Sequence, residues 1–87
     1  MILKEHSLEM RGMPRRDLAE YFLLLGGKPV SSGMYVFPNW RVKLSDEQSH
    51  TLGSMRIPAT LVTFQVNEED WPEIQSAFRL RFLSAGG

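Results

Sequence analysis

The sequence predicts a single α+β domain, residues 1–87, in which an antiparallel sheet carries two helices on one face. Two segments have apolar residues at helical spacing, and each has a proline near its start. The segments before and between them have alternating or continuous apolar residues, which indicate strands. The predicted order is β-α-β-β-β-β-α, for which helices packed on one side of an antiparallel sheet are the natural layered arrangement.

The first strand and the first helix have clear local signals. Residues 2–11 alternate along most of their length between apolar and polar side chains, as a strand does. Pro14 suits the first helical turn, because the N–H that it lacks would be unpaired there. A glycine pair, Gly26 and Gly27, ends the helix, since a left-handed residue after a helix is most easily glycine. The apolar stripe between these ends is Leu18, Phe22 and Leu25.

Two strands are predicted next. Residues 29–37 form the first of them, and the apolar residues at 34–37 fall on both of its faces, which is typical of a well-covered strand. Residues 40–46 alternate, with Trp40, Val42 and Leu44 directed inward.

Two further strands are predicted after a polar segment. Residues 46–50 are polar and predict a hairpin loop. Residues 51–57 predict a weak strand with Gly53 at a bulge. Pro58 is expected to interrupt it, and residues 59–66 then form the last strand.

The second helix has a strong start. Asn67 or Asp70 can cap it, Pro72 fits its first turn, and several carboxylates lie at the positive end of its dipole. Its apolar stripe is Trp71, Ile74, Phe78 and Phe82.

Composition excludes several classes of protein. Ten basic and ten acidic side chains cancel, so nucleic acid is not an expected partner. The chain has no cysteine, which excludes thiolate chemistry and fits a reducing cytoplasm. The charged N-terminal residues do not resemble a signal peptide, and the longest apolar run, residues 21–25, is too short to span a bilayer. We therefore expect a cytoplasmic protein with no membrane partner.

No catalytic, cofactor-binding or metal-binding residue is assigned from the sequence. Neither His6 nor His50 has metal-ligand spacing, and no phosphate-binding glycine motif is present. A triad could be drawn from His50, Ser49 and Asp46, but the nucleophile-elbow motif is missing and hairpin loops are commonly polar. The chain is predicted not to be an enzyme and to need no cofactor.

Arg11, Arg15 and Arg16 cluster where the first strand meets the first helix. Cations at a helix start oppose the helix dipole, so a bound anion or a partner is one interpretation of the cluster. Solvated surface charge is the other.

A sheet with both helices on one side leaves its other face open. Leu3 and Leu61 are predicted on that face, and a partly apolar open face indicates a protein partner, often a second copy of the chain. The exposed polar residues are expected to form a rim around it: Glu5, Glu9, Arg41, Lys43 and Gln65.

The sequence ends in FLSAGG, and its last two residues, Gly86 and Gly87, have two interpretations. Sulfur carriers and ubiquitin-like modifiers activate a C-terminal glycine carboxylate, and glycine suits a tail that must enter a narrow channel. Those carriers, however, end on a strand and have a different order of elements. A helix cap at Gly86 with a frayed end at Gly87 is therefore favoured, and the reactive tail is the alternative.

Three segments together, LGGKPV, WRVKL and AFRLRFLSAGG, resemble a prokaryotic domain found C-terminal to MoaD-type proteins. MoaD-type proteins are the ubiquitin-like sulfur carriers of molybdopterin synthase. The resemblance covers most of the chain and implies the appended domain alone, as a stand-alone chain. It implies a fold similar to the TATA-binding-protein-like class, β-α-β4-α, without implying DNA binding. It also implies a small binding domain accessory to molybdopterin-cofactor or sulfur-transfer proteins, or alternatively a sulfur carrier acting through Gly87.

Overall fold

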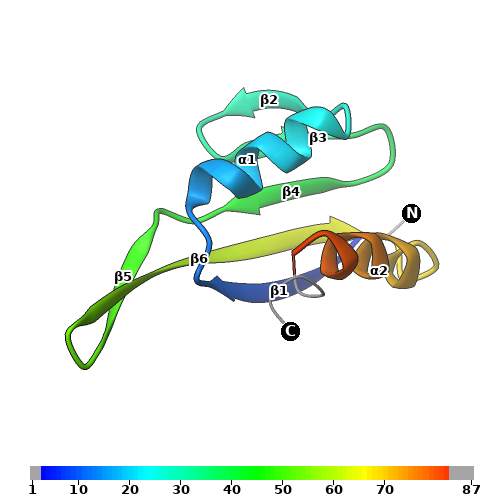
Figure 1. Ribbon diagram of the computed structural model, residues 1–87. Helices are drawn as coiled ribbons and strands as arrows, with labels where there is room; N and C mark the ends of the chain where they lie inside the picture. Colours follow the sequence, from blue (N-terminus) through cyan, green and yellow to red (C-terminus); the bar gives the residue numbers. More distant parts are fainter. Residues whose placement is uncertain (1–2, 83–87) are drawn as a thin grey trace.

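The computed structural model describes residues 3–82 and confirms the α+β class, with two helices and an antiparallel sheet (Figure 1). The sheet has six strands, one more than the sequence predicts. The elements are β1 (Lys4–Arg11), α1 (Arg15–Leu24), β2 (Lys28–Ser31), β3 (Met34–Val36), β4 (Arg41–Leu44), β5 (Gln48–Leu52), β6 (Met55–Val66) and α2 (Trp71–Phe82).

The longest strand, β6, organises the sheet. The strand order is β1-β6-β4-β3-β2, and β5 also pairs with β6. On one edge β6 pairs with β1 from Ala59 to Val66. On its other edge it pairs with β4 at residues 62–65 and then with β5 at residues 55–59. All of these pairings are antiparallel. Together they bring β6 into contact with three of the other five strands.

The predicted single strand at 29–37 is two strands, β2 and β3. A tight turn at Ser32 and Gly33 reverses the chain between them. Gly33 has φ +79°, and a Cβ there would lie 2.7 Å from the carbonyl oxygen of Leu44. The turn therefore needs glycine both for its backbone and for its space. Apolar residues on both sides of the turn gave the appearance of one continuous strand.

The prediction for residues 46–58 was wrong in three places. His50 and its neighbours belong to β5 rather than to a loop, and Gly53, with φ +65°, lies in the hairpin turn rather than at a bulge. Pro58 does not interrupt β6. Its carbonyl accepts a hydrogen bond of 2.8 Å from the N–H of Gly12, on the edge of β6 that faces β1. The nitrogen of a strand residue points to the same edge as its carbonyl, so the Pro58 nitrogen lies beyond the last residue of β1. No ladder hydrogen bond is lost there, which is why proline is tolerated.

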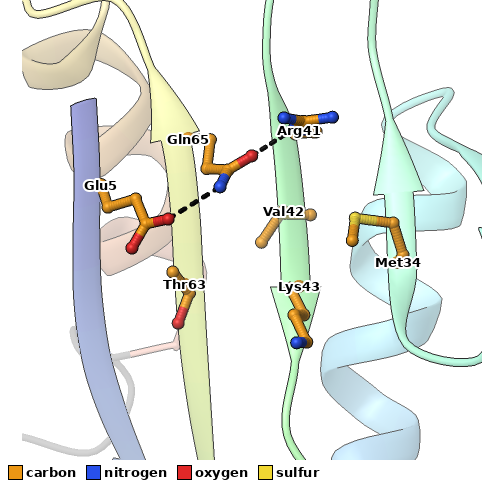
Figure 2. Close-up of a pocket in the computed structure, with 7 residues that line it drawn as sticks. All are labelled: Glu5, Met34, Arg41, Val42, Lys43, Thr63 and Gln65. Carbon is orange, nitrogen blue, oxygen red and sulfur yellow. Dashed lines mark hydrogen bonds between the residues drawn. The ribbon is translucent and has the colours of Figure 1, made fainter. Parts of the chain in front are cut away.

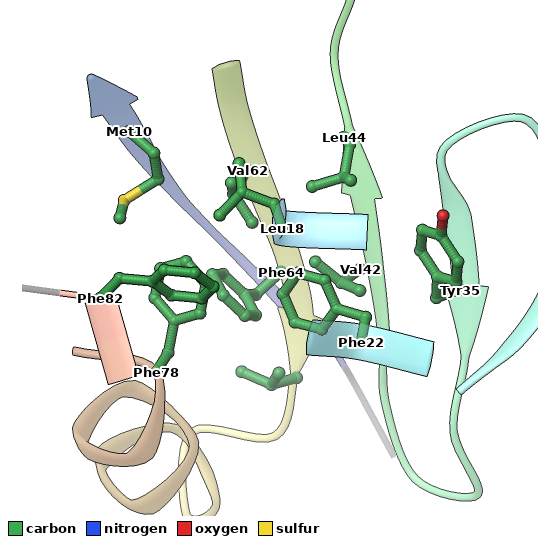
Figure 3. Close-up of a cluster of buried hydrophobic side chains, with 11 residues drawn as sticks. Met10, Leu18, Phe22, Tyr35, Val42, Leu44, Val62, Phe64, Phe78 and Phe82 are labelled. Carbon is green, nitrogen blue, oxygen red and sulfur yellow. The ribbon is translucent and has the colours of Figure 1, made fainter. Parts of the chain in front are cut away.

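Both helices pack on one face of the sheet, as predicted (Figure 3). Phe64 is fully buried, and its ring centroid lies 5.9 Å from that of Phe22 on α1 and 5.3 Å from that of Phe78 on α2. Both contacts are edge-to-face, a favourable aromatic geometry. The other buried sheet residues of this core are Met10, Tyr35, Val42, Leu44, Val62 and Val66.

We predict that Phe64→Ala destabilises the fold by about 3–5 kcal/mol, because it removes the ring that both helices contact and leaves a cavity. Urea unfolding followed by circular dichroism measures the change. Leu24→Ala is the control, since Leu24 is 79% exposed and its loss is expected to change the free energy of unfolding by less than about 0.5 kcal/mol. Equal effects of the two substitutions would contradict the assigned core.

Candidate functional site

The sheet surface opposite the helices, here called the open face, has a polar row across three strands (Figure 2). Glu5 on β1 and Arg41 on β4 are both register partners of Gln65 on β6. The Gln65 amide donates to Glu5 Oε2 over 2.8 Å and accepts from Arg41 Nε. These residues were predicted at the rim of the open face. Glu5 does lie at the rim, on the edge strand β1, whereas Gln65 and Arg41 lie further in, on the inner strands β6 and β4.

A hollow of about 390 Å³ lies beside this row. The next register row has Thr63 on β6 between Ser7 and Lys43, and the Ser7 and Thr63 hydroxyl oxygens are 3.1 Å apart. Among residues 3–82, neither Arg41 nor Lys43 forms an ion pair with a carboxylate. The hollow thus has unpaired positive charge along β4 and negative charge on β1. Its lining includes Glu5, Met34, Arg41, Lys43, Thr63 and Gln65.

A two-stranded hairpin extends beyond the ends of β1 and β4 (Figure 1). We call residues 48–58 the arm. Leu52 is the register partner of Met55, and His50 is the register partner of Ile57. Side chains alternate along β6, so these four residues lie on the same side of the sheet as the open face. Leu52 is 67% exposed and Met55 is 62% exposed. The arm therefore extends the polar open face with a mainly apolar end.

Glu9 ties the base of the arm to β1. Its Oε1 accepts a hydrogen bond of 2.7 Å from Arg11 Nε, and its Oε2 lies 3.8 Å from His50 Nε2. Ala59 lies on β6 between these strands and is only 2% exposed. The contacts join three strands where the arm leaves the sheet.

The three arginines predicted as a possible anion or partner site have separate internal contacts. Arg11 binds Glu9, whereas Arg16 is largely exposed and lies 4.0 Å from Asp17. Arg15 Nε donates to the carbonyl oxygen of Ser45 over 2.8 Å. The structure does not bring the three guanidinium groups together around one point.

Glu47 lies where the sequence suggested an anion, at the start of α1. Its Oε1 accepts a hydrogen bond of 2.7 Å from the backbone N–H of Arg15. The N-cap residue, Pro14, makes no side-chain capping bond. A carboxylate at a helix N-terminus offsets both the unpaired N–H and the unfavourable arginines. No local signal in the sequence reveals this contact between residues 32 positions apart.

Each of the two histidines lies beside a glutamate. His6 Nε2 lies 2.8 Å from Glu68 Oε1, and its ring stacks on Trp71 with centroids 4.2 Å apart. His50 lies in the arm beside Glu9 rather than in a triad with Ser49 and Asp46. Across residues 3–82, the structure holds no group of three His, Asp or Glu side chains placed to bind a metal ion. Within the same range, no helix is long and apolar enough to cross a membrane.

A second concavity, an apolar groove of about 200 Å³, lies between the two helices. Leu25 was predicted in the apolar stripe of the first helix with Leu18 and Phe22, which are buried, whereas Leu25 lines the groove and is 49% exposed. Burial raises the pKa of Tyr21 in this groove, and the positive charge of Arg81 lowers it by less. The other lining residues include Trp40, Glu73, Ile74, Ala77 and Phe78.

The predicted tail residues, Gly86 and Gly87, lie outside the described residues. A family model described as archaeal MoaD-like protein matches residues 6–87, nearly the whole chain. No curated protein matches the chain significantly.

We predict that Glu47→Ala lowers the free energy of unfolding by about 1 kcal/mol, the usual cost of losing a helix cap. Chemical denaturation measures it. Glu20→Ala is the matched control on the exposed side of α1 and is expected to change stability by less than about 0.5 kcal/mol. An unchanged midpoint for Glu47→Ala would show that the carboxylate does not support the helix.

We also predict that alkaline pH destabilises the wild type more than Tyr21→Phe. Because the folded pKa of Tyr21 is raised above the ordinary value of 10.0, the unfolded chain loses this proton first. The stability from the partly buried neutral phenol is present below about pH 10 and is lost as pH rises through the folded pKa. Urea midpoints at about pH 8 and about pH 10.5 measure it, and equal losses in both proteins would contradict the assignment.

Proposed function

Because the chain belongs to the archaeal MoaD-like family, we propose that it is a non-enzymatic protein-binding domain that works with MoaD-type sulfur-transfer proteins in the cytoplasm. The open face is the surface that we assign to binding. The observation that carries the proposal is the Glu5–Gln65–Arg41 row with the hollow beside it, on a face that no helix covers.

The shape and composition of the open face favour a protein over a small ligand. Its hollow is bordered by charges of both signs, and its arm presents Leu52 and Met55 to solvent. Protein interfaces combine an apolar part with polar groups that set orientation. Enclosed, mainly apolar cavities are typical of small-molecule sites, and the open face is extended and mostly polar instead.

The non-enzymatic assignment is supported by the partners of the titratable groups. His6 is held against Glu68 and Trp71, and His50 contacts Glu9. Glu47 caps a helix. These groups have structural partners, and none of them meets a nucleophile within hydrogen-bonding distance in the described part of the chain.

A second candidate function is that of a sulfur carrier acting through the Gly87 carboxylate. It is favoured by one specific observation, the family match, which runs through Gly86 and Gly87. In this case ATP converts the Gly87 carboxylate to an acyl adenylate with release of pyrophosphate, and a sulfide-level sulfur donor then displaces AMP, which carries away the oxygen and leaves a thiocarboxylate. The order of elements, with α2 last, differs from that of ubiquitin-like carriers and favours the binding domain.

We predict that a photoreactive phenylalanine analogue at Lys43, on the open face, cross-links to a protein in cells, whereas the same analogue at Glu20, on exposed α1, does not. Mass spectrometry of the adduct identifies the partner as a second copy or a sulfur-transfer protein. Equal cross-linking at both positions, or none at Lys43, would contradict the proposal.

A truncated chain without Gly86 and Gly87 separates the two candidate functions. The binding domain should keep its Lys43 cross-link after truncation. A carrier should instead show a native intact mass that is raised by the difference between sulfur and oxygen, with fragment ions placing it at Gly87 and not at an oxidised methionine.

A further inference from the structure

We propose that the open face binds the open face of a second copy, with a two-fold axis that runs along β6. This rests on the assignment of the open face to protein contact made under the proposed function, and it names the partner. A two-fold interface requires a surface that is complementary to itself. The open face meets this requirement in its charges and in its apolar residues.

The charges select the direction of the axis. Negative Glu5 lies on β1, where the charge of Glu9 is already paired with that of Arg11. Positive Arg41 and Lys43 lie on β4, with β6 between the two strands. Rotation about an axis along β6 places β1 of one copy over β4 of the other, so Glu5 of each copy faces Arg41 of the other. An axis across the strands would instead place β1 over β1 and bring like charges together, which is costly.

Glu5, Arg41 and Lys43 keep capacity for such a contact, whereas both carboxylate oxygens of Glu9 already face Arg11 and His50. Gln65 binds one carboxylate oxygen of Glu5 and the Nε of Arg41. Among residues 3–82 the second Glu5 oxygen and the terminal nitrogens of Arg41 have no partner, and a guanidinium can bind a carboxylate through more than one N–H. Lys43 has no carboxylate partner within residues 3–82.

The apolar residues of the open face lie along the same axis. Met55, Ile57 and Leu61 occupy alternate positions of β6, so each meets its own counterpart in the two-fold arrangement. Leu52 lies beside Met55 in the arm. Association therefore covers apolar residues that are exposed in the single chain. Leu52, Met55 and Leu61 are between 45% and 67% exposed there.

The arm gains most from this contact. All residues from Gln48 to Arg56 are exposed, and apart from the contact of His50 with Glu9 at its base no described part of the chain packs on the hairpin. An isolated two-stranded hairpin is only marginally stable in water. Along this axis the β6 strands of the two arms face each other, so Met55 and Ile57 of each arm gain an apolar contact in a second layer.

The size of the facing surfaces corresponds to a small interface. The axis places β1 over β4 and β6 over β6, whereas β3 lies on the far side of β4 and faces no strand of the other copy. At about 16 Å² of sheet per residue, β1, β4 and β6 give a flat footprint of roughly 400 Å². This is about half of the roughly 800 Å² that each partner buries in a standard interface, before side-chain relief is counted. A purely acidic partner would match β4 but leave Glu5 facing like charge, so a second copy fits better.

The test uses two charge-reversed variants of the full chain, Glu5→Arg and Arg41→Glu. Sedimentation equilibrium should show the wild type at twice the mass of the 10.0 kDa chain. Each variant alone should dissociate about 100-fold more readily, because like charges meet twice across the axis. Mixed in equal amounts, the two variants should form a heterodimer. One of its contacts is then the native pair of Glu5 with Arg41, and the other joins the two substituted side chains, which again have opposite charges.

An arm substitution tests the apolar contact separately. Met55→Glu should also weaken dimerisation, whereas Leu24→Glu, at a similarly exposed apolar residue on α1, should not. Circular dichroism confirms that each variant is folded. Equal effects of Met55→Glu and Leu24→Glu would overturn the role of the arm in the interface.

The outcomes separate this inference from the proposed function. A monomeric wild type, or two variants that remain monomeric when mixed, would overturn the two-fold interface. If Lys43 still cross-links to another protein in cells, the open face remains a binding surface and only its partner has been wrongly named. If Lys43 cross-links to nothing, both proposals fail.

Discussion

Both faces of the sheet, the one covered by the helices and the open face, depend on the pairing of one central strand, β6, with β1, β4 and β5. Side chains alternate along a strand, so each buried residue of β6 has a neighbour on the opposite face. Phe64 contacts aromatic rings of both helices, and adjacent Gln65 bridges Glu5 and Arg41. A shift of β6 by one residue would exchange these roles, placing Gln65 in the core and Phe64 in water. The aromatic core therefore fixes the register on which the open face relies.

The helices could be predicted from the sequence because their signals are local. Pro14 precedes α1, Gly26 follows it, and the buried residues repeat at helical spacing. The strand boundaries were harder because they depend on neighbours. Pro58 normally argues against an inner strand, and only the end of β1 opposite it makes that position an edge. The Ser32–Gly33 turn was hidden by apolar residues that belong to two different strands.

The sequence predicts which residues belong to the candidate site but not how they are arranged. Alternation alone assigns Glu5, Arg41 and Gln65 to the open face, but their row depends on pairing between residues 24 and 60 positions apart. Strand order decides whether such residues lie at a rim or across the middle, and local pattern does not contain strand order. Glu47 shows the same limit, because its contact with Arg15 exists only after the sheet and α1 have packed.

The opposite charges of Glu5 and Arg41 are separated on the open face, and this separation suits the binding of a partner. A direct ion pair between Glu5 and Arg41 would satisfy both groups within one chain and leave little for a partner. Gln65 between them keeps the opposite charges on separate strands while holding both side chains in place through its amide. Exposed ion pairs contribute little to the stability of a single chain, so this separation costs the fold little. The same charges determine orientation strongly when another surface approaches and water is excluded. The apolar arm then supplies contact area, and the polar row determines which surface can make that contact.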